Sequence, residues 1–183
     1  QGNHCMVTIR EARIEDAAGM AKVHVDSWRT TYAGIVPDSY LANLSYARRE
    51  AFWHDILGDA ASQGYPFVAV NDEGQIVGFV SGGPQRNGDP VYQAELYSIY
   101  LLQEYQGQGV GRQLTRRLVE AFLQAGIRSM LLWVFAENPA RHFYEALGGQ
   151  RLRVEQADFD GVMVDEVAYG WPDITVILRE KKL

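Results

Sequence analysis

The sequence predicts a single α/β domain with a mixed sheet, and three observations support this fold class. The 183 residues and their 47% hydrophobic content suit one domain with a sizeable buried core. No repeat, low-complexity tract or long linker divides the chain, so residues 1–183 are treated as one domain. Strand-like stretches occur both as hairpins and on either side of a helix, so antiparallel and parallel pairing should coexist.

The first half of the chain should place helices before its first hairpin. The expected elements are, in order, a strand at 7–13, a helix at 14–31 ended by "GIVP", a short turn opened by Pro37, a helix capped by Ser45, and two strands at 66–70 and 75–83. Gly74 lies between these two strands, which predicts a tight hairpin turn.

The second half should contain a strand–helix–strand unit. The expected elements are a long strand at 91–102, a helix at 108–125 ended by Gly126, a buried strand at 129–135, a short helix at 139–147, and two strands within 150–171. Asp160 and Gly161 should form the turn between the last two strands.

Composition and charge exclude several classes of function. The formal net charge of −6 and the lack of a basic run argue against nucleic acid as a partner. Cys5 is the only cysteine, which excludes an internal disulfide and favours the cytoplasm. No apolar run approaches the roughly 20 residues that span a membrane, and the first residues do not resemble a signal peptide. The position of Met6 suggests that residues 1–5 are a remnant of cloning.

A glycine-rich turn joins the long strand to the helix after it. Gly107, Gly109 and Gly111 alternate where the helix start offers unpaired N–H groups and a partial positive charge. Because glycines let these amides approach an anion closely, the turn indicates a phosphate site. Arg112 replaces the third glycine of a dinucleotide fingerprint, and no Gly-Lys-Ser/Thr follows, so neither a Rossmann site nor a P-loop fits. A tight turn without a ligand is the alternative.

The segment "QGQGVG" at 106–111 resembles the Gln/Arg-x-x-Gly-x-Gly/Ala signature of the GNAT superfamily of acyl-CoA-dependent N-acyltransferases. The long strand before it, "SMLLWVF" after the helix, and "ENPARHFYEALGG" with Asn138 and Tyr144 occur in the family's order. The resemblance is close from about 92 to 150 and looser elsewhere. It implies the GNAT fold, in which a central, mostly antiparallel twisted sheet has two splayed strands and helices on both faces.

The resemblance also implies where acetyl-CoA binds as the cosubstrate. In the family, the pyrophosphate of coenzyme A sits on the amides of the glycine loop, here Gln106, Gly107, Gln108, Gly109, Val110, Gly111 and Arg112. The pantetheine arm follows the free edge of the splayed strand, here Ile99, Tyr100 and Leu101, and the Leu101 N–H would polarise the thioester carbonyl. Asn138, which also suits a helix cap, would contact pantetheine. Gln103 stands where the family often has proline, which leaves the local bend open.

Two residues are candidates for the proton transfers that amide formation requires. Glu95 interrupts an otherwise apolar strand, and alternation should place it on one face with Tyr97, Ile99 and Leu101. In some family members a glutamate at the matching position is the general base, whereas the alternative is a carboxylate that is exposed or paired with an arginine. Tyr144 should point inward, and the family motif places it near the coenzyme sulfur as the general acid. A core aromatic is its alternative.

Residues of the acceptor cleft are expected where the first long helix breaks. The segment "SWRTTYAGIVPDSY" gathers Trp28, Arg29 and Tyr32, and in the family the corresponding helix forms one wall of the cleft. These three residues are therefore predicted to bind the substrate, although helix packing is an equally good interpretation of Trp28.

Metal and hydrolase chemistry lack support in the sequence. His24, His54 and His142 lie on separate predicted helices without metal-ligand spacing, so no metal is expected. No Gly-x-Ser-x-Gly elbow occurs, which argues against a serine hydrolase.

The sequence therefore predicts an enzyme that moves an acetyl group from acetyl-CoA to a primary amine of a small molecule or peptide by direct attack in a ternary complex. A non-catalytic acyl-CoA-binding or sensing module and an interaction domain are the alternatives, and Glu95 with Tyr144 favours the enzyme. The acidic composition favours a cationic acceptor or polyamine, although net charge does not describe a cleft. No membrane partner is expected, and a homodimer and other acyl groups are left open.

Overall fold

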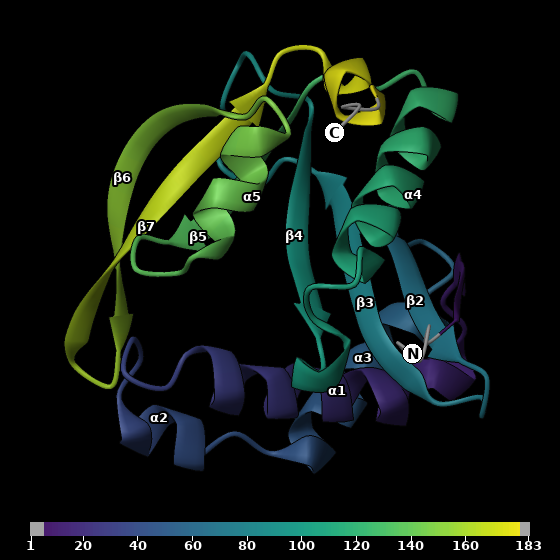
Figure 1. The fold of residues 1–183 in the computed structure, drawn as a ribbon, viewed down its shortest axis with the longest axis vertical. Coiled ribbons are helices and arrows are strands. Elements are labelled where there is room, and N and C mark those ends of the chain that lie inside the picture. The colour runs from purple at the N-terminus through teal and green to yellow at the C-terminus, as the bar shows by residue number, and fades with distance from the viewer. Residues whose placement is uncertain (1–5, 180–183) are drawn as a thin grey trace.

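The computed structural model describes residues 6–179, which form a seven-stranded sheet of order β1-β2-β3-β4-β5-β7-β6 (Figure 1). The strands are β1 (Val7–Glu11), β2 (Tyr65–Asn71), β3 (Ile76–Pro84), β4 (Ala94–Leu101), β5 (Met130–Phe135), β6 (Gln150–Phe159) and β7 (Val162–Trp171). Every neighbouring pair is antiparallel except β4 and β5. The mixed, mostly antiparallel sheet predicted from the sequence is confirmed.

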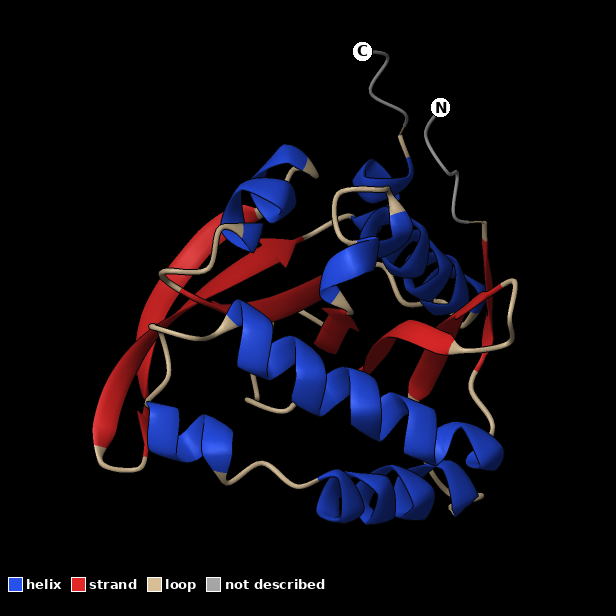
Figure 2. Ribbon diagram, turned by 60° about the horizontal axis from the view of Figure 1, so that its bottom comes forward, coloured by secondary structure: helices blue, strands red, loops and turns tan. Residues whose placement is uncertain are grey.

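Helices cover both faces of this sheet (Figure 2). The α-helices are α1 (Ala17–Thr31), α2 (Asp38–Ala42), α3 (Tyr46–Gly58), α4 (Val110–Gln124) and α5 (Ala140–Ala146), and the 3-10 helices are η1 (Ile14–Asp16), η2 (Gln103–Tyr105) and η3 (Ile174–Leu178). α4 packs on β2, β3 and β4, whereas α1 packs on β3 and β4 from the other side. α3 packs against α1, and its Trp53 reaches Phe79 of β3 on the same face of the sheet.

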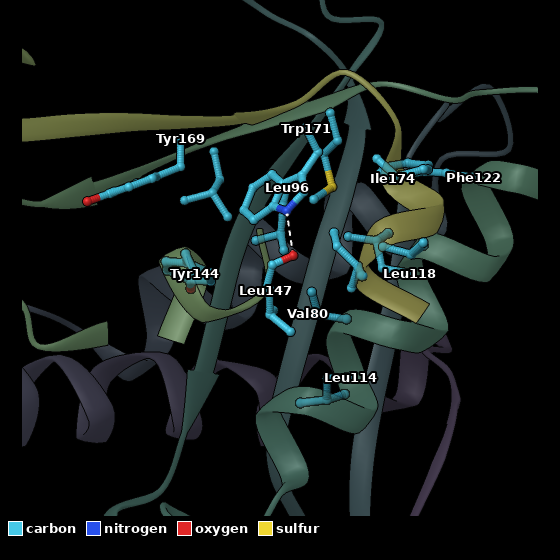
Figure 3. Close-up of a cluster of buried hydrophobic side chains, with 14 of the residues drawn as sticks. Val80, Leu96, Leu114, Leu118, Phe122, Tyr144, Leu147, Tyr169, Trp171 and Ile174 are labelled. Atoms are coloured by element: carbon cyan, nitrogen blue, oxygen red, sulfur yellow. Dashed lines mark hydrogen bonds between the residues drawn. The ribbon is translucent and has the colours of Figure 1, made fainter. Parts of the chain in front are cut away.

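The larger hydrophobic core lies beneath α4 (Figure 3). Leu114, Leu118 and Phe122 recur every four residues along one side of α4 and are fully buried. The indole Nε1 of Trp171 donates a hydrogen bond of 3.1 Å to the Leu147 carbonyl, which ties β7 to the chain that follows α5. The core therefore fixes the start of α4, and the glycine loop before it, relative to the sheet.

β4 and β5 pair over a short distance only. Residues 94–96 lie opposite residues 130–132 in parallel register, and within the described chain the pairing stops there. Beyond this point β5 turns away from β4 (Figure 1). The splayed strands implied by the family resemblance are therefore confirmed, and the crossover helix between them is α4.

A β-bulge interrupts β4 where it leaves β5. Gly82 of β3 pairs with Leu96, and the preceding Ser81 pairs with Ser98, so Tyr97 is an extra residue in β4. The Ser81 and Ser98 hydroxyls form a hydrogen bond of 2.6 Å across the two strands.

The bulge changes which side chains share a face. Leu96 belongs to the core beneath α4, so Glu95, one residue earlier, faces away from that core. Ile99 and Leu101 nevertheless pack against the same core. The expectation that Glu95 shares a face with Ile99 and Leu101 is therefore wrong, because the extra residue reverses the alternation.

Several element boundaries differ from the predicted ones. The first helix begins as a 3-10 turn at 14–16, where the Asp16 carboxylate accepts the Arg13 N–H at 2.7 Å and pairs with Arg10. The helix predicted at 108–125 starts at Val110, because Gly109 has a φ of 83° in the left-handed region. The prediction that residues 1–5 are a cloning remnant, Cys5 included, lies outside the described residues.

Candidate active site

A cavity of about 1110 Å³ opens where β4 and β5 diverge. Its walls are residues 95–101 of β4, residues 132–135 of β5, the glycine loop, the start of α5, the end of α1 and parts of β6 and β7. Ligand cavities in proteins commonly measure about 300–1000 Å³, so this one has room for a large donor and an acceptor together. The fold brings most of the predicted site residues to this opening.

The glycine loop presents a row of unpaired backbone donors at the cavity. Gly107 and Gly109 have φ angles of 74° and 83°, and the space around a Cβ at either position is open. Within residues 6–179, none of the N–H groups from 107 to 112 donates to a protein acceptor, and the first helical bond runs from the Gln113 N–H to the Gly109 carbonyl at 3.1 Å. Such a row at a helix start suits the oxygens of a pyrophosphate.

Side chains of the loop differ in where they point. The residues that line the cavity are Gln106, Gly107, Gly109, Gly111 and Arg112. Gln108 instead donates its side-chain amide to the Glu104 carbonyl at 2.8 Å. Val110, the first residue of α4, is buried in the core between α4 and the sheet. Gln103 begins the 3-10 turn η2, so the bend before the loop forms without proline. Because the expected phosphate contacts are made by backbone amides, the orientation of the Gln108 and Val110 side chains does not affect them.

The outer edge of β4 faces the gap between the splayed strands. The Leu102 N–H donates to the Val77 carbonyl of β3 at 2.9 Å. Since successive residues of a strand direct their N–H groups to opposite edges, the N–H groups of Leu101 and Ile99 point away from β3 and into the gap. Tyr100 directs its backbone toward β3 by the same alternation, so it reaches the cavity through its ring.

Tyr144 of α5 lies on the cavity wall and is also part of the core. Its ring packs edge-on to Phe143 and Trp171, and no group within residues 6–179 hydrogen-bonds its hydroxyl. Burial raises the pKa of Tyr144 well above its usual value, which keeps the phenol protonated and able to donate. Asn138 lines the same wall, and its Oδ1 accepts the Ala140 N–H at 2.9 Å as a helix cap.

Glu95 is 1% exposed and is held by Arg86. Its carboxylate accepts hydrogen bonds from the Arg86 backbone N–H at 3.2 Å, from Nε at 3.4 Å and from Nη2 at 2.7 Å. The guanidinium also lies over the Tyr97 ring, 4.2 Å from its centroid. The arginine pairing that the sequence left open as an alternative is thus present. A base role for Glu95 would require an oxygen that Arg86 now engages.

Sequence reasoning missed two further carboxylates in this cavity, Glu155 of β6, which pairs with Arg153 at 3.5 Å, and Glu166 of β7. Glu166 lies opposite Phe135 of β5 and Glu155 of β6. Burial, and to a smaller extent the Glu155 carboxylate, raises the pKa of Glu166, and no cation within residues 6–179 forms an ion pair with it. Val164 and Ala168, two residues to either side, are buried, so the period-two pattern of the strand could have revealed an inward-facing acid.

Two of the three residues predicted to bind the acceptor reach the cavity. Trp28 and Tyr32 line it from the last turn of α1, with their ring centroids 4.7 Å apart. Arg29 does not line it, because its Nε and Nη2 donate to the carbonyls of Leu41 and Leu44 at 3.2 and 3.0 Å. Arg29 thereby ties α1 to α2 and the chain that follows it.

Residues 6–179 contain no group of three or more His, Cys, Asp or Glu side chains arranged to hold a metal ion. His54 and His142 are exposed, and His24 is buried among aromatic rings. In the same part of the chain no helix has the length and apolar character needed to cross a bilayer.

Comparison with known proteins supplies independent evidence on the family of this chain. Residues 12–149 match the Acetyltransferase (GNAT) family. The chain is 44% identical to the uncharacterized N-acetyltransferase YuaI of Bacillus subtilis, over 94% of this chain and 96% of the relative. It is 26% identical to the L-amino acid N-acyltransferase MnaT of Escherichia coli over 78% of each chain. It is 25% identical to the spermidine N(1)-acetyltransferase of Thermoplasma acidophilum, over 83% of this chain and 91% of the relative.

A solved structure shows the same fold with the coenzyme bound. The PaiA N-acetyltransferase of Thermoplasma acidophilum in complex with coenzyme A superposes with a TM-score of 0.68 at 22% identity, over 88% of this chain and 98% of that one. The resemblance drawn from the glycine loop is confirmed: the chain belongs to the GNAT family and is an N-acetyltransferase of that family.

Proposed function

We propose that this enzyme transfers the acetyl group of acetyl-CoA to a primary amine of a small molecule or peptide, by direct attack of the amine on the thioester in a ternary complex. The observation that carries the proposal is the row of unpaired N–H groups from 107 to 112 beside the gap between β4 and β5. The row suits the pyrophosphate, and the gap offers an extended arm the unpaired edge of a strand.

Donor binding in this proposal rests on backbone groups. The amides of residues 107–112 hold the pyrophosphate, whereas the Gln106 N–H already donates to the Gln103 carbonyl at 3.2 Å. The backbone of Ile99 and Leu101 holds the pantetheine arm. The Leu101 N–H points into the gap and donates to the thioester oxygen as negative charge develops there. Asn138, buried on the facing wall, orients the arm from the other side.

Two proton movements complete the transfer. The amine nitrogen bonds to the acetyl carbon, the carbon–sulfur bond breaks, and Tyr144 donates a proton to the departing thiolate. An alkyl amine has a pKa of about 10.4, so a carboxylate that removes its proton is useful at neutral pH. Glu95 was the base expected from the sequence. Glu166 is favoured instead, because it faces the same cavity without an arginine partner in the described chain.

The named relatives support a primary amine as the common acceptor group. One is named for L-amino acids and another for spermidine, which share that group and little else. Trp28 and Tyr32 would form the aromatic wall against which the acceptor lies.

The proposal is tested by following release of free coenzyme A thiol while acetyl-CoA is mixed with amines, amino acids, polyamines and peptides. Turnover with at least one class of primary amine, together with saturable binding of coenzyme A by calorimetry, is the expected result. Coenzyme A binding without turnover on any amine would instead indicate the binding or sensing module. Absence of coenzyme A binding would overturn the proposal altogether.

A further inference from the structure

A second cavity, of about 650 Å³, adjoins the first on the face of the sheet that carries α1 and α3. It lies between α3, the segment before β2, and strands β3 and β4. The residues shared by the linings of both cavities are Trp28, Arg86, Tyr97, Ser98 and Tyr100. The two cavities are therefore adjacent along this part of β4.

Aromatic rings form the inner wall of this second cavity. His24, Trp28, Trp53 and Tyr100 all line it. The His24 and Tyr100 ring centroids lie 4.9 Å apart, and Trp53 is 4% exposed. Such a wall favours an apolar or aromatic body in the ligand.

The charged groups that line this cavity are all positive. Arg49 of α3 and Arg86 line it, and no Asp or Glu is among its lining residues in the described chain. This is the reverse of the protein as a whole, whose formal net charge is −6. A polyamine would bring further positive charge to these arginines, whereas an anion would be attracted to them.

Within the described chain, Arg49 differs from Arg86 in having no charged partner. Arg86 is bound to Glu95 at 2.7 Å, whereas Arg49 forms no ion pair and no side-chain hydrogen bond within residues 6–179. Its guanidinium lies over the Phe52 ring, 5.2 Å from the centroid, which leaves its fork of donors available for a carboxylate.

His24 contributes no competing charge to the cavity. Burial, and to a smaller extent the nearby Arg49, lowers the pKa of His24 to about 3, so the imidazole is neutral at physiological pH. Its two ring nitrogens, like the indole N–H groups of Trp28 and Trp53, are buried without hydrogen-bond partners in the described chain. The positive charge of the cavity therefore comes from its arginines.

We propose that the acceptor is an amino carboxylic acid with an apolar or aromatic body, whose carboxylate binds Arg49 in the second cavity while its amine reaches the first. The proposal rests on the proposed acetyl transfer and narrows its substrate class. It reverses the expectation of a cationic acceptor or polyamine that the overall acidic composition suggested.

The test compares acceptors that differ only in the acidic group. Phenylalanine and leucine are paired with phenylalaninamide and leucinamide, and spermidine is included as a polyamine. Acetylation rates and KM are measured for wild type, Arg49→Gln and Arg49→Lys. The matched control is Arg48→Gln, which alters a neighbouring arginine on α3 that does not line the cavity.

With wild type, the acids should have lower KM values than their amides by roughly 10–100-fold, the range of a hydrogen-bonded charge pair. Arg49→Gln should remove that difference by raising KM for the acids with kcat nearly unchanged. Arg49→Lys should keep part of it, and Arg48→Gln should keep all of it. Amides or spermidine that match the acids with wild type, or a preference for acids that survives Arg49→Gln, would overturn the proposal.

A binding measurement separates failure of this proposal from failure of the proposed function. The same acids and amides are titrated by calorimetry into wild type and Arg49→Gln saturated with coenzyme A. If no amine is acetylated but the acids still bind more tightly in an Arg49-dependent way, the catalytic proposal fails and the second cavity remains a carboxylate site. Equal binding of acids and amides overturns the carboxylate site whatever the turnover.

Discussion

The donor and acceptor sides of the gap between β4 and β5 are built in different ways. The donor side is mainly one continuous segment, residues 99–112, which offers backbone groups, with the Asn138 side chain added from the facing wall. The acceptor side gathers side chains from α1, α3, β4 and β7, which lie far apart in the sequence. Backbone groups are present whatever the side chain, so donor binding should tolerate most substitutions except those at the glycines. Acceptor binding and proton transfer should follow individual side chains.

The largest effect should come from Tyr144, which lies where the two sides meet. Tyr144→Phe keeps the ring that packs on Trp171 but removes the proton offered to the thiolate. We expect kcat to fall by roughly 10²–10⁴-fold, the range for loss of a general acid. Coenzyme A affinity, measured by calorimetry, should change little.

The matched control for Tyr144 is Tyr92→Phe. Tyr92 is also buried, but it lies outside both cavities, so its hydroxyl should not affect turnover. Equal turnover of Tyr144→Phe and wild type would leave Tyr144 as a core residue only.

The next largest effect should come from the glycine loop. Gly109→Asp places a carboxylate among the amides expected to hold the pyrophosphate, at a φ of 83°. Like charges in contact cost several kcal/mol, so coenzyme A affinity should fall about 100-fold. Gly74→Asp controls for backbone strain, since Gly74 has a φ of 79° in the hairpin turn between β2 and β3. Unchanged affinity in Gly109→Asp, with the circular dichroism of wild type, would remove the loop from the donor site.

The same contrast explains what could be predicted from the sequence. The glycine loop, the splayed strand pair and the position of Tyr144 depend on local spacing within residues 92–150, so one short motif and its neighbours indicate them together. The acceptor side depends on contacts between distant segments. Arg29 illustrates this, because only the fold reveals that it binds the carbonyls of Leu41 and Leu44.

One error arose within a strand rather than between segments. Strict alternation along β4 placed Glu95 with Ile99 and Leu101, and the extra residue at Tyr97 broke that pattern. No glycine or proline in β4 marks the bulge, since the small residues lie opposite it in β3, at Gly82 and Gly83. A Cβ at Gly82 would come within 2.9 Å of the Glu95 carbonyl oxygen, so the close approach that needs glycine is visible only in the structure.

A smaller effect should distinguish Glu166 from Glu95, two of the carboxylates that line the cavity. If Glu166 accepts the amine proton, kcat/KM should rise with pH through the raised pKa of Glu166, because only the deprotonated carboxylate acts as a base. Glu166→Gln should lower kcat/KM by roughly 10²-fold at neutral pH, the lower end of the range for a general base, and remove that ionisation. Glu95→Gln should keep the shape of the profile, because Glu95 is already engaged by Arg86.

This prediction requires two acceptors of different basicity. A profile that moves with the pKa of the acceptor, and is the same for wild type and both variants, would assign deprotonation to solvent. Loss of the ionisation in Glu95→Gln alone would restore the base expected from the sequence.

The smallest effect on activity is expected for a substitution of Arg29. This substitution tests whether Arg29 belongs to the wall of the acceptor side. Arg29→Ala removes two hydrogen bonds to the carbonyls of Leu41 and Leu44, at the junction of α1 and α2. Because Arg29 is exposed, the loss should lower the free energy of unfolding by only about 1 kcal/mol.

The matched control is Arg151→Ala, which alters an exposed arginine on β6 without side-chain bonds in the described chain. It should leave the free energy of unfolding, measured in urea, unchanged. With Arg29→Ala, the KM for the acceptor should stay at the wild-type value, because the Arg29 guanidinium points away from the cavity. A raised KM with unchanged stability would instead show that Arg29 turns toward the substrate, as the sequence suggested.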